Sequence, residues 1–187
     1  MHLFHGSNTF NLHTLVPRLA DHDRPYIYLS ESQVVAGFYL ANGVTRPYYW
    51  FPYGFTDNKI PQYHELYPNA LQEVSEGLSG VIYEVDPPGP ILQPFKNIPG
   101  AWLGIEPIPV ISKIIIQDCY QWFMTMEIQG KLVISRFEEK TKKELDGWYD
   151  MIFTFIREKD MIRTPECSYA LFVKEKFPWV WEQYENA

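Results

Sequence analysis

The sequence predicts an α+β fold in one domain, because strand patterns fill the first three-quarters of the chain and helical patterns follow them. Its 187 residues suffice to bury one core, and 46% are hydrophobic against 21% charged, as in ordinary globular proteins. Short β-rich runs punctuated by fifteen prolines predict strands. Apolar residues recurring every three or four positions after residue 140 predict helices. Strands that precede helices in this way are typical of the α+β class.

The N-terminal 40 residues predict a strand, a turn, a second strand and a helix. Residues 1–6 are short and apolar and run into a Gly-Ser-Asn turn, and residues 25–30 (PYIYLS) alternate as strands do. We expect Ser30 or Ser32 to cap a helix that carries apolar residues at positions 34, 35, 38, 39 and 40.

The middle of the chain predicts an irregular loop and several strands. Residues 46–68 are crowded with Pro, Tyr, Gly and Asn, which favours a long loop of the functional kind. A helical turn or two is expected at 70–76. Strands are expected at 81–85 (VIYEV), at 132–137 and at the isoleucine-rich segment 110–117, which we predict to be buried.

The last third predicts two helices. One spans about 141–158, with a face formed by Leu145, Trp148, Tyr149, Ile152, Phe153 and Ile156. The second spans 168–176 and precedes Pro178. We therefore divide the single domain 1–187 into a core of about 1–137 and a helical extension of about 138–187.

Charge and hydropathy exclude two classes of partner. The net charge is −7, and Glu138, Glu139 and Glu144 flank the best basic cluster, residues 140–143, so this cluster is predicted to be a solvated helix face. Non-specific nucleic-acid binding is therefore not expected. No apolar run approaches the ~18 residues of a membrane span, and no leader pattern opens the chain, so we expect a cytoplasmic protein without membrane contact.

Standard metal and nucleotide motifs are absent. Cys119 and Cys167 form no zinc-ligand spacing, and His64 with Glu65 lacks a second histidine at helical spacing. No metal site is expected. The sequence also lacks the Gly-rich dinucleotide and P-loop patterns.

Two motifs near the N-terminus carry a family resemblance. Residues 3–7 (LFHGS) place His-Gly-Ser at the end of the first strand, and residues 26–30 (YIYLS) place Tyr28 in the second. Ala36 and Tyr39 follow Tyr28 at offsets of eight and eleven. This combination resembles the ADP-ribosyltransferase superfamily, in its diphtheria-toxin and poly-ADP-ribose-polymerase-like branch, although Tyr26 stands where glycine is common. The resemblance implies a split antiparallel β-sheet core with helices, and NAD as substrate.

The resemblance also implies roles for the motif residues. His5 would hydrogen-bond a ribose hydroxyl of NAD, and Gly6, followed by Ser7, would bring its main chain against the nicotinamide carboxamide, which the missing Cβ permits. Tyr28 and Tyr39 would sandwich the nicotinamide ring, with Ala36 on the same helix.

A cation and a carboxylate complete the expected site. Arg18 is the nearest cation for the pyrophosphate, unless it is a surface arginine. For the third motif of the family, a glutamate before a late strand, we select Glu106, with Glu84 and Glu127 as competitors. A fixed carboxylate would stabilise the positive charge that develops on the ribose as the glycosidic bond loosens.

The sequence thus favours an NAD-dependent ADP-ribosyltransferase with Glu106, His5 and Tyr28 as catalytic residues and an unknown acceptor: a protein, a nucleic acid or a small molecule. A related enzyme that removes an RNA 2′-phosphate is an alternative, against which the acidic balance and the few early arginines speak. A non-catalytic module that binds a nucleotide or a partner on the same fold is the third reading.

Overall fold

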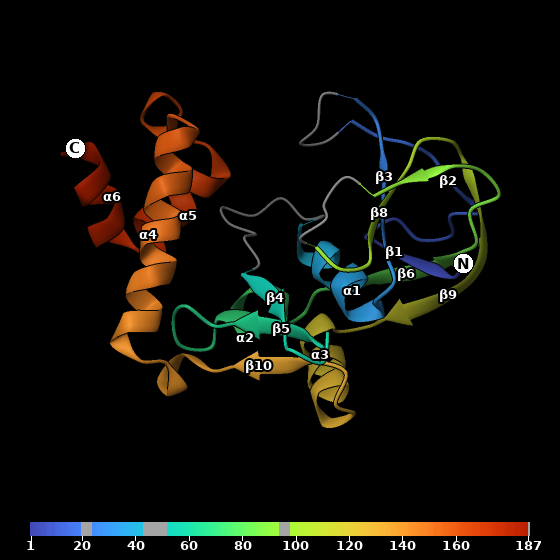
Figure 1. The fold of residues 1–187 in the computed structure, drawn as a ribbon, viewed down its shortest axis with the longest axis horizontal. Helices are drawn as coiled ribbons and strands as arrows, with labels where there is room; N and C mark the ends of the chain where they lie inside the picture. The colour runs from blue at the N-terminus through green and yellow to red at the C-terminus, as the bar shows by residue number, and fades with distance from the viewer. Residues whose placement is uncertain (20–23, 43–51, 94–97, 187) are drawn as a thin grey trace. The chain divides into compact units, whose positions relative to one another are not determined.

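The computed structural model describes residues 1–19, 24–42, 52–93 and 98–186. The chain forms two compact units. Figure 1 colours the chain by residue number. Unit 1 comprises Met1–Val44, Phe55–Pro61 and Ser75–Val133, and unit 2 comprises Thr45–Gly54, Gln62–Val74 and Ile134–Ala187. Strands and helices mix in the α+β manner that the sequence predicts. The expectation of a single domain stays a prediction.

Unit 1 is built on a large antiparallel sheet whose strand order is β2-β9-β6-β1-β3-β8-β7. In chain order its strands are β1 (Leu3–Ser7), β2 (Thr14–Leu15), β3 (Ile27–Ser30), β6 (Gly80–Val85), β7 (Ile91–Leu92), β8 (Ala101–Gly104) and β9 (Ile108–Ile116). β1 therefore lies near the middle of the sheet, between β6 and β3. The two strands predicted to carry the motifs are neighbours.

The pairing of β1 differs on its two sides. Against β6 it stays in register from Leu3↔Val85 to Ser7↔Val81. Against β3 it pairs at Phe4↔Ser30, and beyond that pair the ring of His5 reaches across to a β3 carbonyl. The His5 side chain thus adds a hydrogen bond between the two strands.

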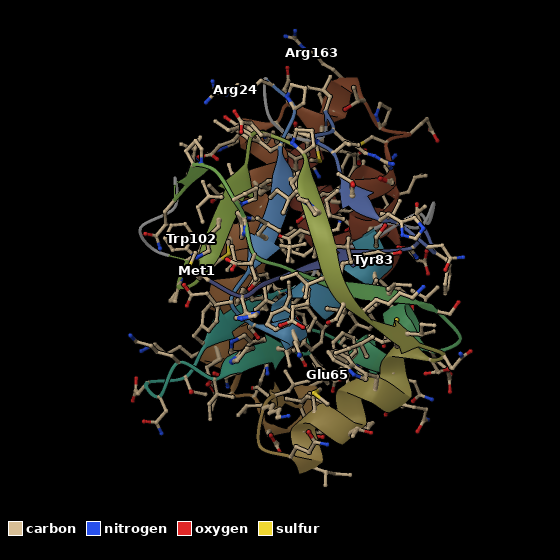
Figure 2. The ribbon with its side chains drawn as sticks, turned by 90° about the vertical axis from the view of Figure 1, so that its right-hand side faces the viewer. Met1, Arg24, Glu65, Tyr83, Trp102 and Arg163 are labelled. Atoms are coloured by element: carbon tan, nitrogen blue, oxygen red, sulfur yellow. The ribbon has the colours of Figure 1, made fainter. Side chains whose placement is uncertain are left out.

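The two faces of the sheet are covered differently. One face buries a cluster formed by Leu3, Leu15, Ile27, Leu29, Val81, Tyr83, Val85 and Ile108. Figure 2 labels Tyr83, whose hydroxyl donates to the Thr9 carbonyl at 2.8 Å and accepts from the Leu12 amide at 3.0 Å. Because side chains alternate along a strand, Phe4 and Gly6 point to the opposite face, where helix α1 (Gln33–Asn42) lies on β1.

Two helices complete unit 1. Ser32 caps α1, because its Oγ accepts from the Val35 amide at 3.3 Å, as one of the two predicted caps. Helix α3 (Cys119–Ile128) begins at Asp118, whose side chain accepts from the Gln121 amide at 2.9 Å. Trp122 of α3 packs against Gly37 of α1, where an added Cβ would meet the indole at 2.5 Å.

Unit 2 is largely helical. Its helices are α2 (Ala70–Ser75), α4 (Lys142–Glu158), α5 (Ser168–Lys176) and α6 (Pro178–Glu185), and the apolar core among them includes Ile152, Phe172, Phe177 and Trp181. A capping box starts α4: the Thr141 side chain and Glu144 hydrogen-bond each other's backbone amides. Most residues of a three-stranded sheet, order β10-β5-β4, also belong to this unit; its strands are β4 (Tyr53–Phe55), β5 (Pro61–His64) and β10 (Val133–Ser135).

Most predicted elements are confirmed, and two expectations need correction. The predicted loop 46–68 contains β4 and β5 in its described part, and residues 46–51 lie outside the described residues. The isoleucine-rich run does form a strand, β9, but it is not buried: Ile111 and Ile115 are 56% and 50% exposed. β9 pairs with β6 along most of its length, whereas β2 reaches only Ile108 and Pro109. Among the residues that the structure describes, no strand pairs with the other edge of the second half of β9.

Candidate functional site

His5 links the two motif strands. Its Nδ1 lies 2.8 Å from the carbonyl oxygen of Tyr28 on β3, so Nδ1 carries the proton and donates. Burial lowers the pKa of His5, the hydrogen bond to Tyr28 opposes this, and the positive charge of Arg18 lowers it further. The imidazole is therefore neutral at pH 7 with a lone pair on Nε2, which is the form that accepts a hydrogen bond from a hydroxyl.

Tyr28 and Tyr39 face one another. Tyr28 comes from β3 and Tyr39 from α1, and their ring centroids lie 6.2 Å apart with 26° between the planes. A flat ring inserted between two others needs about 3.5 Å on each side, or roughly 7 Å in all. The centroid distance of 6.2 Å is the most that the gap between the planes can be, so the rings must separate by at least about 1 Å to admit a third ring.

Gly6 is in close contact with α1. A Cβ at Gly6 would lie 1.9 Å from the carbonyl oxygen of Ala36 and 3.0 Å from its carbonyl carbon. The missing side chain therefore lets the helix backbone approach the strand, a reason that sequence analysis did not give. The expected contact of the Gly6 main chain with a ligand stays a prediction. Ala36 is buried at this contact.

Ser7, Asn8 and Arg18 have different environments. Ser7 Oγ accepts from the Thr9 amide at 3.1 Å and so fixes the turn after β1. The side-chain oxygen of Asn8 is buried, and no hydrogen-bond partner for it occurs among the described residues. Arg18 is exposed, exchanges two 3.0 Å backbone hydrogen bonds with Tyr26, and acts electrostatically on His5.

Glu106 lies on the exposed turn between β8 and β9. Its carboxylate lines a small cavity with residues 87–91, and a Cβ at Gly89 would meet Oε2 at 3.0 Å. Within the described ranges, Glu106 makes no hydrogen bond or ion pair with His5, Tyr28 or Tyr39. Its role in a common cleft with these residues stays a prediction.

The two competing glutamates occupy other environments. Glu84 on β6 accepts from Ser112 Oγ at 2.5 Å and pairs with His2 at 2.8 Å. These partners lower the pKa of Glu84, with the hydrogen bond from Ser112 as the largest cause. Glu127 lies near the C-terminal end of α3.

Sequence analysis missed a cavity of about 550 Å³ at the N-terminus of α1, hereafter the α1 cavity. Glu31, Lys59 and Lys131 are the charged residues that line it. They come from three distant segments of unit 1, so no local motif joins them. The one local signal was the Ser-Glu-Ser sequence at residues 30–32 that starts the helix.

The described ranges hold neither a metal-ligating cluster nor a membrane-spanning helix. They contain no group of three or more His, Cys, Asp or Glu side chains arranged to hold a metal ion. No helix in this part of the chain has the length and apolar composition needed to cross a bilayer. Burial raises the pKa of Cys119 to about 12, so this thiol is protonated and unreactive at neutral pH.

No protein-family model matches the chain, and no curated protein sequence is significantly similar to it. Functional inference therefore depends on the geometry around His5 and on the α1 cavity.

Proposed function

We propose that the chain binds NAD at the His5–Tyr28–Tyr39 site and cleaves its nicotinamide–ribose bond, passing ADP-ribose to an acceptor. The observation that carries this proposal is the pair of near-parallel rings, 6.2 Å between centroids, together with a neutral His5 that donates a hydrogen bond to the Tyr28 carbonyl. A flat heterocycle fits between the rings after they separate by at least about 1 Å. A sugar hydroxyl suits the free Nε2 of His5.

Each residue has a physical task in this proposal. Tyr28 and Tyr39 hold the nicotinamide by stacking and burial. His5 accepts a hydrogen bond from a ribose hydroxyl and so fixes the sugar. Arg18 supplies positive charge for the pyrophosphate, consistent with its electrostatic effect on His5.

A carboxylate is the remaining requirement. As the glycosidic bond loosens, the ribose carbon gains positive charge, and a fixed negative charge nearby lowers the barrier. We assign this task to Glu106, because it directly precedes strand β9 as the family resemblance requires. The acceptor is a protein, a nucleic acid or a small molecule.

The test is release of nicotinamide from NAD by the purified chain. We expect release by the wild type, its loss in Glu106→Gln and His5→Ala, and its loss in Tyr39→Ala but not in Tyr39→Phe, which keeps the ring. His13→Ala changes an exposed histidine and is the matched control. If Tyr39→Ala releases nicotinamide like the wild type while folded, the stacking site is wrong.

A second candidate is a non-catalytic module that binds NAD or a related nucleotide. The exposed position of Glu106 beside Gly89 favours it, because a catalytic carboxylate acts from a partly dry cleft. Calorimetry separates the two functions. Binding of NAD without nicotinamide release supports the module, and absence of both binding and release excludes both candidates.

A further inference from the structure

The α1 cavity lies wholly within unit 1 and has a volume of about 550 Å³. Its walls come from the N-terminus of α1, the turn between β4 and β5, and the C-terminal end of α3. This volume falls in the range of small-molecule sites. None of His5, Tyr28 or Tyr39 lines it.

The charges around the α1 cavity favour an anion. Lys59 and Lys131 line it, and neither side chain makes an ion pair or hydrogen bond with any described residue. Glu31 is the acidic residue that lines the cavity, and its Oε1 accepts from the indole N–H of Trp102, labelled in Figure 2, at 2.9 Å. The cavity is thus lined by two positive charges and one negative charge, and the Glu31 carboxylate already accepts a hydrogen bond.

The helix end adds to this positive field. Ser32 satisfies the amides of Val35 (through Oγ, 3.3 Å) and Ala36 (through its carbonyl, 3.0 Å). The amides of Gln33 and Val34, in the first turn that lines the cavity, have no helical carbonyl to bond. Such N–H groups, with the positive end of the helix dipole, favour negative charge.

The rest of the wall is apolar. Val34, Pro61 and Met126 are buried, and Phe4 and Ile60 are half-buried beside them. A hydrated inorganic ion would leave this surface wet, whereas a ligand with an apolar body would cover it and gain free energy from its burial. The cavity therefore combines a cationic end with an apolar wall.

Lys59 occupies an unusual position for a side chain of its size. Its φ is 61°, in the left-handed region, and its amide closes a tight turn by donating to the Thr56 carbonyl at 2.8 Å. A residue with a Cβ costs about 1–2 kcal/mol in this conformation, which glycine adopts without strain. A lysine here places a cation at the cavity at the expense of stability.

We propose that the α1 cavity binds a small organic anion, a carboxylate or phosphate monoester with an apolar body. Lys59, Lys131 and the first-turn amides of α1 receive the anionic group, and the wall around Met126 receives the apolar body. The proposal is independent of NAD binding, because it uses none of the residues assigned to that site.

The test uses 1-naphthyl phosphate and 1-naphthoate as anionic probes and 1-naphthol as the neutral probe, with binding measured by calorimetry. We expect at least one anion to bind at least ten-fold more tightly than 1-naphthol, and the stronger of the two identifies the headgroup. Lys131→Gln should weaken its binding five- to ten-fold. Lys113→Gln is the matched control, because Lys113 contacts Asn11 and does not line the cavity.

Lys59→Gly separates binding from folding. It removes the cation and also the left-handed strain, so we expect five- to ten-fold weaker binding together with a higher unfolding temperature. Tyr39→Ala should leave probe binding unchanged. Equal affinity of Lys59→Gly, Lys131→Gln and the wild type, loss of probe binding in Tyr39→Ala, or no binding of either anion to the wild type would overturn the proposal.

Discussion

Replacement of Gly6 by alanine tests the contact that joins α1 to the sheet. The new Cβ would lie 1.9 Å from the Ala36 carbonyl oxygen, whereas ordinary contact begins at 3.4 Å, so the helix must withdraw by about 1.5 Å. Neither neighbour is a flexible side chain that could turn away, because both close atoms belong to the helix backbone. The strain therefore has to be taken up by moving packed elements.

The cost follows from overpacking of a close-packed interior. Such insertions typically cost 1–3 kcal/mol, and a backbone clash belongs at the upper end, so we expect about 3 kcal/mol. In a chain of this size that corresponds to a fall of roughly 6–12 °C in the unfolding temperature.

Thermal unfolding followed by circular dichroism, without any ligand, measures this effect. Gly147→Ala is the contrasting variant, because Gly147 lies inside α4 and a Cβ there meets nothing within 4 Å. It should stabilise the chain by about 0.5–1 kcal/mol. If Gly6→Ala unfolds within about 2 °C of the wild type, the close approach of α1 does not have the importance that we assign to it.

Three further substitutions test burial, protonation and capping. Ile116→Ala should lower the free energy of unfolding, measured in urea, by about 2–5 kcal/mol, because the Ile116 side chain is only 2% exposed. Ile115→Ala should lower it by less than about 1 kcal/mol, because Ile115 is 50% exposed. Similar losses in the two variants would contradict the exposed edge of β9. Burial lowers the pKa of His5 below its ordinary 6.5, so the unfolded chain binds this proton first and stability falls as the pH drops below 6.5. His5→Gln should flatten that fall in pH-dependent urea titrations, and the exposed His13→Gln should not. Thr141→Ala removes a capping side chain and should cost about 1 kcal/mol by the same urea assay, and no change would exclude a contribution from the cap.

The sequence predicted those elements whose pattern is local. Helix α4 and strand β6 were predicted because each carries a regular pattern of apolar residues along its whole length. Helix α3 was missed, although Cys119, Phe123 and Met126 are buried on one face, because aromatic and polar residues alternate irregularly between them. The helix predicted at 168–176 was found, but α6 after it was missed; Pro178 occupies the first turn of α6, where its missing amide has no partner to lose.

Whether a strand is buried, and which residues meet at the site, depends on the neighbours of each strand in the fold. The amino-acid composition of a strand does not reveal those neighbours. A run of isoleucines is equally compatible with a central strand and an edge, so β9 was placed inside the core. The neighbouring positions of His5 and Tyr28 were predictable from a motif resemblance. The α1 cavity was not, because Glu31, Lys59 and Lys131 lie far apart in the chain and each alone looks like a surface charge.

Helix α1 connects the two ligand sites that we propose. Its ten residues span about 15 Å, and they carry Tyr39 toward one end and the cavity amides at the other. The contact at Gly6 presses the helix against the strand between these ends, so a small tilt that widens the gap between the two tyrosines must also shift the amides. If both proposed ligands bind, a tilt of this kind would couple their affinities, and by thermodynamic linkage the factor would be the same in both directions, even though the two sites share no residue.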